Sequence, residues 1–367
     1  MKLVHFADLH LDSPFAWAGA SGEIARRRRE ALRETLRRIV KLTKEVSADA
    51  LFCGGDLYEH DRVTPDTAEL LRTTFAELES IPIFISPGNH DWYGPHSLYA
   101  LTEWSPNVHV FQEASLQCVE LDDGLTLWGG AHLAPANADN FLEGFHVEGS
   151  GLHIALFHGA ERSWLSEQGS GKQPHAPFDA WQIEQAGLHH AFLGHYHRPK
   201  DAERHTYPGN PDPLEFGEDG DRGAVVATIE ASGRVTPERR CVAVTTVHDV
   251  DLDITGCTTR QQVRDRLEEQ IAGLSGLARL TVRGELEPSL ELREGDLRDV
   301  MRAFDAVRFR IGELRPAYAI DAIRDEQTVR GQFVRDVLAA GLPTEEERRV
   351  LATGLRALGG RGDLEVL

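Results

Sequence analysis

Residues 1–10, MKLVHFADLH, join a short apolar run to two candidate metal ligands. Val4 and Phe6 are typical strand formers, and Asp8 and His10 follow at the point where the strand should end. Four more polar blocks each come directly after a strand-like run. They are Gly54-Gly55-Asp56, Gly88-Asn89-His90-Asp91, His158-Gly159 and Gly194-His195-Tyr196-His197. The same unit, an apolar run followed by polar ligands, therefore recurs through the first 200 or so residues.

The residues between these blocks predict a parallel sheet covered by helices. Its first strand-like runs are Lys2–Phe6, Ala50–Cys53 and Ile81–Ile85. Residues 22–46 repeat apolar side chains at intervals of three and four, which is typical of an amphipathic helix. Thr64 followed by Pro65 marks the start of another helix, which should run to about Leu78. In such a sheet, functional groups collect at the carboxyl ends of the strands, where the polar blocks lie.

From about Val108 the pattern changes to shorter strands. We expect them at 108–111, 116–121, 125–128, 152–157, 190–193 and 223–229, with Asp122-Asp123-Gly124 as a hairpin turn. A second sheet that faces the first would give an α/β/β/α sandwich with the site at one edge. The fold class predicted from the sequence is therefore α/β.

The composition changes again near Val247, and we expect three parts. Residues 1–245 would form the main domain, which carries the polar blocks, residues 246–316 a small α/β cap domain, and residues 317–367 a helical tail. The tail should contain a helical hairpin, with one helix at 326–339 and a second that ends near Leu358. Val329, Phe333, Val337 and Leu338 would line one face of the first helix. This hairpin could pack on its own cap domain or dock another chain.

Composition narrows the class of protein. No apolar run approaches the roughly eighteen residues of a membrane helix, and the initial strand leaves no room for a cleaved signal. Cys53, Cys118, Cys241 and Cys257 form no disulfide framework, which favours the reducing cytoplasm. The net charge of −20 means that the chain lacks the broad basic surface of tight DNA binders. A basic cluster within residues 26–44 is either a solvated helix face or a phosphate-binding patch.

The polar blocks supply carboxylate, amide and imidazole ligands but no thiolate. Such a set suits two hard-to-borderline divalent cations rather than a structural zinc ion. Paired cations held about 3.5–4 Å apart can clamp the attacking and leaving oxygens of a phosphoryl centre. The sequence therefore predicts a two-metal phosphoesterase.

The five blocks resemble the calcineurin-like metallophosphoesterase superfamily, and more closely its DNA repair nuclease branch of SbcD- and YhaO-type enzymes. Two further stretches carry the narrower resemblance, residues 7–15 and residues 207–223. The resemblance covers residues 1–245 well. Beyond them it is fainter and rests on residues 328–334.

The resemblance implies a role for each candidate residue. The first cation would be held by Asp8, His10, Asp56 and His197, and the second by Asp56, Asn89, His158 and His195. Asp56 would bridge the two, and Asp91 or backbone carbonyls would orient the imidazoles. His90 would stabilise the transition state and help to protonate the leaving 3′ oxygen. Glu59 stands where relatives often carry a histidine or aspartate that positions DNA.

The other histidines have weaker claims to the site. His132 and His153 compete with His158 for its ligand position, but His158 ends an apolar run and precedes a glycine. The rest are expected to be surface or packing residues, including His96, His146, His175, His189 and His205.

As a whole, the resemblance implies a Mn²⁺-dependent DNA exonuclease and endonuclease of DNA repair or defence. Its partners would be DNA and an SMC-like coiled-coil ATPase that docks on residues 326–358, and the chain could form a homodimer. One alternative keeps the dimetal site but gives it nucleotides or phosphoproteins as substrates. Another alternative is a non-catalytic partner subunit, which should have lost His90 or some ligands; this sequence retains them all.

Overall fold

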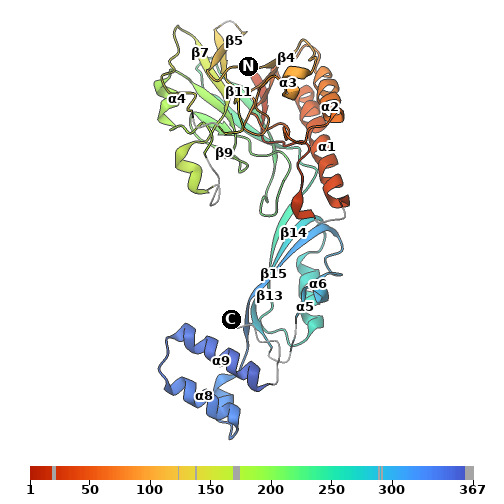
Figure 1. Cartoon of the computed structure of the whole chain (residues 1–367), viewed down its shortest axis with the longest axis vertical. Helices are drawn as coiled ribbons and strands as arrows, with labels where there is room; N and C mark the ends of the chain where they lie inside the picture. The colour runs from red at the N-terminus through yellow and green to blue at the C-terminus, as the bar shows by residue number, and fades with distance from the viewer. Residues whose placement is uncertain are drawn as a thin grey trace. The chain divides into compact units, whose positions relative to one another are not determined.

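The computed structural model describes residues 1–18, 22–122, 124–136, 139–167, 174–287, 290 and 292–359. The chain divides into two compact units, Met1–Thr246 and Val247–Leu367 (Figure 1). Each unit has its own hydrophobic clusters. None of the helices in the described ranges is long and apolar enough to cross a membrane.

The first sheet of the first unit contains the strand that opens the chain. Its order is β12-β11-β1-β2-β3-β4. The strands are β1 (Lys2–Phe6), β2 (Ala50–Cys53), β3 (Ile83–Ile85), β4 (Val108–Val110), β11 (Gly223–Ile229) and β12 (Val235–Cys241). β1 to β4 are parallel, whereas β11 runs antiparallel to β1 and β12 antiparallel to β11. The parallel core confirms the strand–helix–strand pattern seen in the sequence.

Helices connect the parallel strands of this sheet. They are η1 (Ala16–Ala18), α1 (Glu23–Glu45), α2 (Pro65–Ala76) and α3 (Leu98–Leu101). Leu32, Leu36 and Ile39 of α1 are buried, as the spacing of apolar residues predicted. Thr64 caps α2 by accepting a hydrogen bond from the backbone N–H of Thr67.

The second sheet has the order β5-β6-β7-β8-β10-β9. Its strands are β5 (Gln117–Asp122), β6 (Leu125–Gly129), β7 (Leu152–His158), β8 (His190–Gly194), β9 (Lys200–Asp201) and β10 (His205–Tyr207). η2 (Arg162–Glu167) and α4 (Trp181–Gln185) accompany this sheet. β5 and β6 form the expected antiparallel hairpin, although Asp123 in its turn lies outside the described residues.

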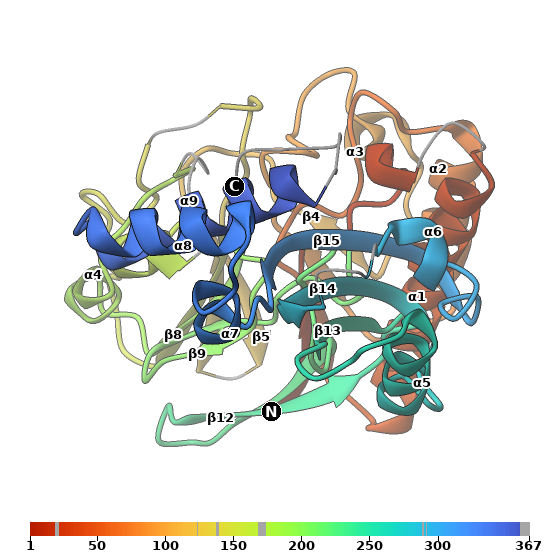
Figure 2. The ribbon, with the colours of Figure 1, turned by 90° about the horizontal axis from the view of Figure 1, so that it is seen from below.

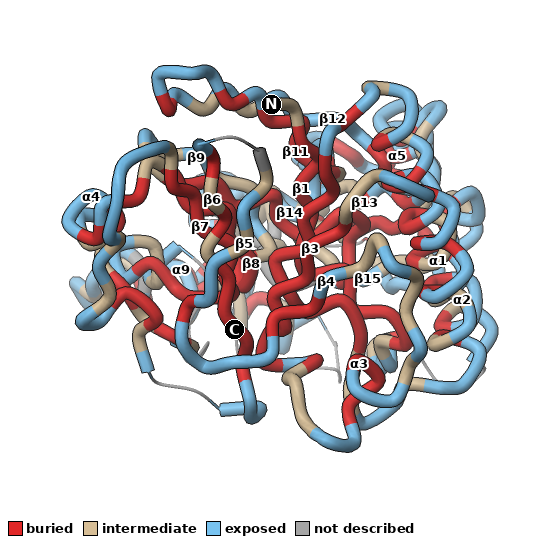
Figure 3. The backbone as a smooth tube through the Cα atoms, turned by 90° about the horizontal axis from the view of Figure 1, so that it is seen from above, coloured by how far each residue is buried: buried red, intermediate tan, exposed pale blue. Residues whose placement is uncertain are grey.

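A shared hydrophobic core joins the two sheets. It contains Leu3, Phe52 and Phe84 from the first sheet, and Leu127, Ile154 and Phe192 from the second. Phe52 and Phe192 meet edge to face with ring centroids 5.5 Å apart. Two further buried clusters flank this core. The cluster on one side lies under α1 and α2, and the cluster on the other side includes Ile183 of α4. Figure 3 shows the buried strands inside and the exposed helix surfaces outside, which confirms the α/β/β/α sandwich.

The division of strands between the sheets differs from the sequence pattern. That pattern grouped residues 108–111 and 223–229 with the second sheet, but β4 and β11 belong to the first. β4 extends the parallel series beside β3, and β11 returns to the open edge of β1. β12 was not expected, because its largely exposed residues lack an apolar alternation.

The backbones of the two sheets are in close contact where β2 and β8 end. A Cβ atom on Gly54 would lie 3.0 Å from the backbone nitrogen of Gly194, and one on Gly194 would overlap the carbonyl oxygen of Gly54. Only glycine allows this approach. His5 in β1 adds a buried hydrogen bond to the carbonyl of Leu193, at 3.0 Å. The polar blocks that follow β2 and β8 are therefore brought together.

The second unit begins with three parallel strands, β13 (Val247–Asp253), β14 (Gly276–Leu286) and β15 (Phe304–Pro316), which lie side by side in Figure 2. α5 (Arg260–Gln270) and α6 (Glu294–Leu297) accompany them, and Val263, Leu267 and Leu297 join the buried cluster of this sheet.

Three helices complete the second unit: α7 (Ile320–Arg324), α8 (Val329–Ala339) and α9 (Thr344–Leu358). Val334 and Val337 of α8 pack against Leu351 and Leu355 of α9. Val329, which the sequence places on the same face of α8 as Phe333 and Val337, is 74% exposed. It is the first residue of α8, directly after the capping Thr328, and Val334 faces the partner helix instead.

Candidate metal centre

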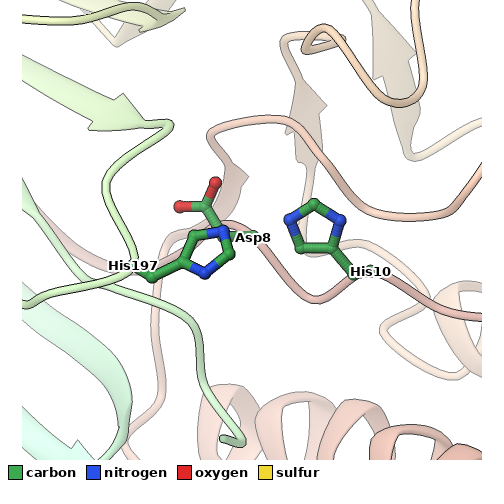
Figure 4. Close-up of side chains that lie close together, drawn as sticks. All are labelled: Asp8, His10 and His197. Carbon is green, nitrogen blue, oxygen red and sulfur yellow. The ribbon is translucent and has the colours of Figure 1, made fainter. Parts of the chain in front are cut away.

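The candidate residues follow strands of both sheets at the edge where the sheets meet. Asp8 and His10 follow β1, Asp56 follows β2, Asn89 and His90 follow β3, His158 ends β7, and His195 and His197 follow β8. The side chains of Asp8, His10 and His197 converge in Figure 4. The structure therefore brings together all the residues that the sequence nominated, although they span nearly 200 positions.

Three groups of ligand atoms among the described residues could each hold a cation, and the ligand atoms of each group lie within 4.8 Å of one another. The first consists of Asp8, His10 and His197, the second of Asp8, Asp56 and His158, and the third of His10, Asp56 and His90. Oδ2 of Asp56 lies 3.6 Å from Nε2 of His10 and 3.3 Å from Nε2 of His158. The Asp56 carboxylate thus lies between His10 of the first group and His158 of the second, where a bridging ligand would lie.

The orientation of His158 fits a cation. Its Nδ1 lies 2.8 Å from the carbonyl oxygen of Gly54, which fixes the proton on that nitrogen. Its Nε2 then faces Oδ1 of Asn89 at 3.1 Å and Oδ2 of Asp56 at 3.3 Å. Burial opposes a charge here, yet the Asp56 carboxylate raises the pKa of His158 to about 9. The oxygens of Asn89 and Asp56 favour positive charge at Nε2, so they would also favour a divalent cation there.

The orientation of His10 is fixed by a carboxylate. Nδ1 of His10 lies 2.8 Å from Oε1 of Glu59. Its Nε2 is buried and has no hydrogen-bond partner among the described residues. A buried ring nitrogen without a partner is costly unless it binds a ligand. Nε2 of His10 is therefore the atom that would bind the first cation.

His197 is oriented in the same way by Glu218. Nδ1 of His197 lies 3.0 Å from Oε1 of Glu218, whose other oxygen accepts hydrogen bonds from Nδ2 of Asn210 at 2.7 Å and from the backbone N–H of Leu214 at 2.6 Å. Burial opposes ionisation, but the hydrogen bond with His197 holds the pKa of Glu218 well below its usual range. Arg222 donates to the carbonyl of His197 at 2.7 Å. Residues 207–223 therefore position the candidate ligand His197.

Both the backbone and the ring of His195 lie at the candidate centre. Its N–H donates to Oδ1 of Asp8 at 2.9 Å. Its ring lies 5.2 Å from the ring of His158 and 5.5 Å from that of His175. The sequence did not indicate this position for His175, because no apolar run or glycine precedes it.

The Asp91 carboxylate binds backbone amides in the loops of the site instead of a histidine ring. This buried carboxylate accepts hydrogen bonds from the backbone N–H groups of Asp56 at 3.0 Å, Leu57 at 2.7 Å and Gly88 at 2.6 Å, and from the hydroxyl of Tyr99 at 2.5 Å. Burial and the neighbouring Asp56 charge raise its pKa to about 6. The expectation that Asp91 orients a ligand imidazole is corrected, since nearby backbone amides use its oxygens.

Four candidate ligands have strained backbones. The φ angles are 56° at Asp8, 49° at His10, 50° at Asp56 and 109° at His195. Positive φ costs a residue with a Cβ atom of order 1–3 kcal/mol, and such residues cluster at functional sites. The strain indicates that the fold orients these side chains toward the candidate metal centre.

Glu59 also links the candidate ligand His10 to His90. Its Oε2 lies 2.9 Å from Nδ1 of His90, while its Oε1 contacts His10. Burial opposes the charged carboxylate, but these two hydrogen bonds lower the pKa of Glu59 to about 2. Burial likewise opposes a charged His90, but the hydrogen bond to Glu59 raises the pKa of His90 to about 9. The His90 side chain is 44% exposed, and its backbone N–H donates to Oδ1 of Asp56 at 2.8 Å.

Comparisons with known proteins agree with this geometry. Residues 1–199 match the family model described as calcineurin-like phosphoesterase. The chain is 28% identical over 235 residues to the uncharacterized metallophosphoesterase YhaO of Bacillus subtilis (strain 168), a match that covers 61% of this chain and 56% of YhaO. It is 28% identical over 240 residues to the DNA double-strand break repair protein Mre11 of Methanopyrus kandleri, which covers 59% of this chain and 50% of Mre11.

The chain thus spans about half the length of the curated relatives it matches. Among solved structures, TT1561 of Thermus thermophilus matches 65% of this chain and 98% of its own, with 13% identity and a TM-score of 0.37.

We expect Mn²⁺ to raise the melting temperature of the wild-type chain relative to the same protein in a chelator. A ligand that binds only the folded state adds about 2.7 kcal/mol of stability at a hundred times its Kd. Asp56→Ala removes the carboxylate between the two cation positions, so most of this rise should disappear. Differential scanning calorimetry with and without Mn²⁺ measures both proteins. An equal Mn²⁺-induced rise in the variant would contradict the bridging position of Asp56.

Glu59→Gln should weaken Mn²⁺ binding about 10–100-fold, the usual cost of losing a group that orients a metal ligand. His10 and His90 each contact a different carboxylate oxygen of Glu59, and a glutamine replaces one of these two acceptors with an NH₂ donor. Isothermal titration calorimetry with Mn²⁺ gives the affinity directly. Glu77→Gln is the matched control, because Glu77 is exposed and pairs only with Lys44 among the ion pairs of the described residues. Equal affinities in both variants would rule out an orienting role for Glu59.

Proposed function

The chain belongs to the calcineurin-like phosphoesterase family, and we propose that its metal centre hydrolyses phosphodiester bonds of DNA as a Mn²⁺-dependent exonuclease and endonuclease. The activity of the family is metal-dependent hydrolysis of phosphoesters at a dimetal site. The step to DNA is supported mainly by the match, over 240 residues, to a protein of Methanopyrus kandleri named for DNA double-strand break repair.

The residues divide the work of hydrolysis. Cations held by Asp8, His10, Asp56, Asn89, His158, His195 and His197 would supply a nucleophile from water and offset the charge of the phosphate. Asp56 fixes the distance between the two halves of the site. The half-exposed His90 lies beside His10, where its imidazole could donate a proton to the leaving 3′ oxygen. Glu59 keeps His90 next to the ligand His10.

The surface charge argues against tight binding of long DNA by this chain alone. The net charge is −20, and the basic cluster on α1 is largely neutralised. Arg28 is buried against Asp212 at 2.8 Å, and Arg27, Arg37, Lys41 and Lys44 pair with glutamates. The cluster is therefore a poor phosphate-binding patch. The same charge favours the second candidate, a phosphodiesterase or phosphatase of nucleotides or phosphoproteins.

Incubation with linear double- and single-stranded DNA, a small diester and a monoester, with and without Mn²⁺, separates these candidates. We expect Mn²⁺-dependent cleavage of DNA that is absent in Asp56→Ala. His90→Ala should retain Mn²⁺ binding but cleave about 10²–10⁴-fold more slowly, the usual contribution of general acid–base catalysis. Hydrolysis of the small esters with DNA left intact would favour the second candidate. A His90→Ala rate equal to that of the wild type would refute its role as the acid.

An SMC-like coiled-coil ATPase is the partner that we propose, and it could supply the positive surface that this chain lacks. The proposed docking element is Glu326–Leu358, where Val329 and Leu358 are 74% and 46% exposed. The four cysteines are free, in keeping with the cytoplasm as the proposed compartment. A homodimer is proposed on the same grounds of family resemblance.

We expect the chain to co-purify with an SMC-like ATPase encoded beside it and to be stimulated by it. Val329→Asp should reduce co-purification, because it places a charge in the proposed interface. Arg302→Asp on the same unit is the control, since Arg302 is exposed and outside the proposed docking element. Failure of the wild-type proteins to associate would exclude this partnership.

A further inference from the structure

We propose that Trp92 and His60 form a stacking site for a nucleobase beside His90, an inference that rests on the nuclease function proposed above. The two rings are stacked, with centroids 3.9 Å apart and planes inclined by 26°. Both residues are half-buried. They present a flat aromatic pair next to the candidate acid.

The pair is fixed at the functional edge of the sheet. His60 lies in the loop after β2 and Trp92 in the loop after β3, the two loops that also carry Asp56 and His90. The backbone N–H of His60 donates to the carbonyl oxygen of His90 at 2.9 Å. Glu59, the neighbour of His60, contacts the imidazole of His90. A substrate whose phosphate lies at His90 therefore has the aromatic pair within its immediate surroundings.

Core packing does not account for Trp92. Other tryptophans pack on the hydrophobic clusters of this unit, namely Trp17, Trp104, Trp128 and Trp164. Trp92 belongs to none of the hydrophobic clusters formed by the described residues. Nδ1 of His60 is buried and, within the described ranges, forms no hydrogen bond. The stack therefore holds these two side chains outside the core, and a further flat ring would extend it.

A nucleobase is the ligand that suits this pair. Every base has a π-face, so stacking binds it whatever its sequence, and each stacked base adds to affinity. Stacking also needs no positive charge, which matters for a chain with a net charge of −20. Bases in an intact duplex already stack on their neighbours and cannot reach such a site. The pair therefore points to unpaired nucleotides, as in a single strand or a frayed end.

Dithymidine monophosphate offers one scissile bond and tests the site directly. Its hydrolysis in Mn²⁺ is compared with that of the two analogues in which either the 5′ or the 3′ base is missing, and KM and kcat are measured for each. We expect the loss of one of the two bases to raise KM about tenfold in the wild type, in line with the usual strength of base stacking. Trp92→Ala should abolish this preference, whereas Trp92→Phe should retain most of it.

Trp181→Ala is the matched control, since Trp181 is 61% exposed on α4 and has no ring partner among the described residues. It should keep the full preference. A preference unchanged in Trp92→Ala, or an equal loss of activity toward all three substrates, would overturn the stacking site. A wild-type enzyme that cleaves these substrates and linear DNA without a preference for the base would refute this inference alone. A wild-type enzyme that cleaves neither would refute the nuclease function and the stacking site with it.

Discussion

The metal centre depends on the close contact of two backbones, at Gly54 in the first sheet and Gly194 in the second. No side chain fits between them. The contact lies at the carboxyl ends of β2 and β8, so it places Asp56 against His158 and His195 against Asp8. The two sheets also share an apolar core, which is not directional. The glycine contact and the buried hydrogen bond of His5 supply the register that a polar site requires.

Around this contact, carboxylates that are not candidate ligands set the geometry. Glu59 and Glu218 orient His10 and His197, while Asp91 gathers the backbone amides of the loops that follow β2 and β3. Each of these carboxylates accepts at least two hydrogen bonds, which offset the cost of burying its charge. Because Glu59 and Glu218 contact Nδ1 of His10 and His197, the Nε2 atoms of these imidazoles are left to face the acidic centre. The strained φ angles at Asp8 and Asp56 can persist because these bonds over-determine the loops.

The acidity of the chain bears on substrate choice. Long-range attraction of DNA requires positive charge, and most of the cations on α1 are already paired. Recognition by short-range contacts, such as stacking at Trp92, does not have this requirement. A partner that delivers DNA and a site that holds an unpaired nucleotide are therefore complementary parts of the same proposal.

The sequence by itself determined the α/β class, the parallel core and the five polar blocks, because these features depend on local periodicity and on residues at strand ends. It nominated every candidate ligand that the structure brings together, from Asp8 to His197. The tertiary structure alone decided the roles of Glu59, Glu218 and Asp91, the position of His175 beside His195, and the exposure of Val329. The hydrogen bonds of Glu59 and Asp91 to residues 31 to 49 positions away leave no periodic trace in the sequence. Such contacts arise only when distant loops meet at the edge shared by the two sheets.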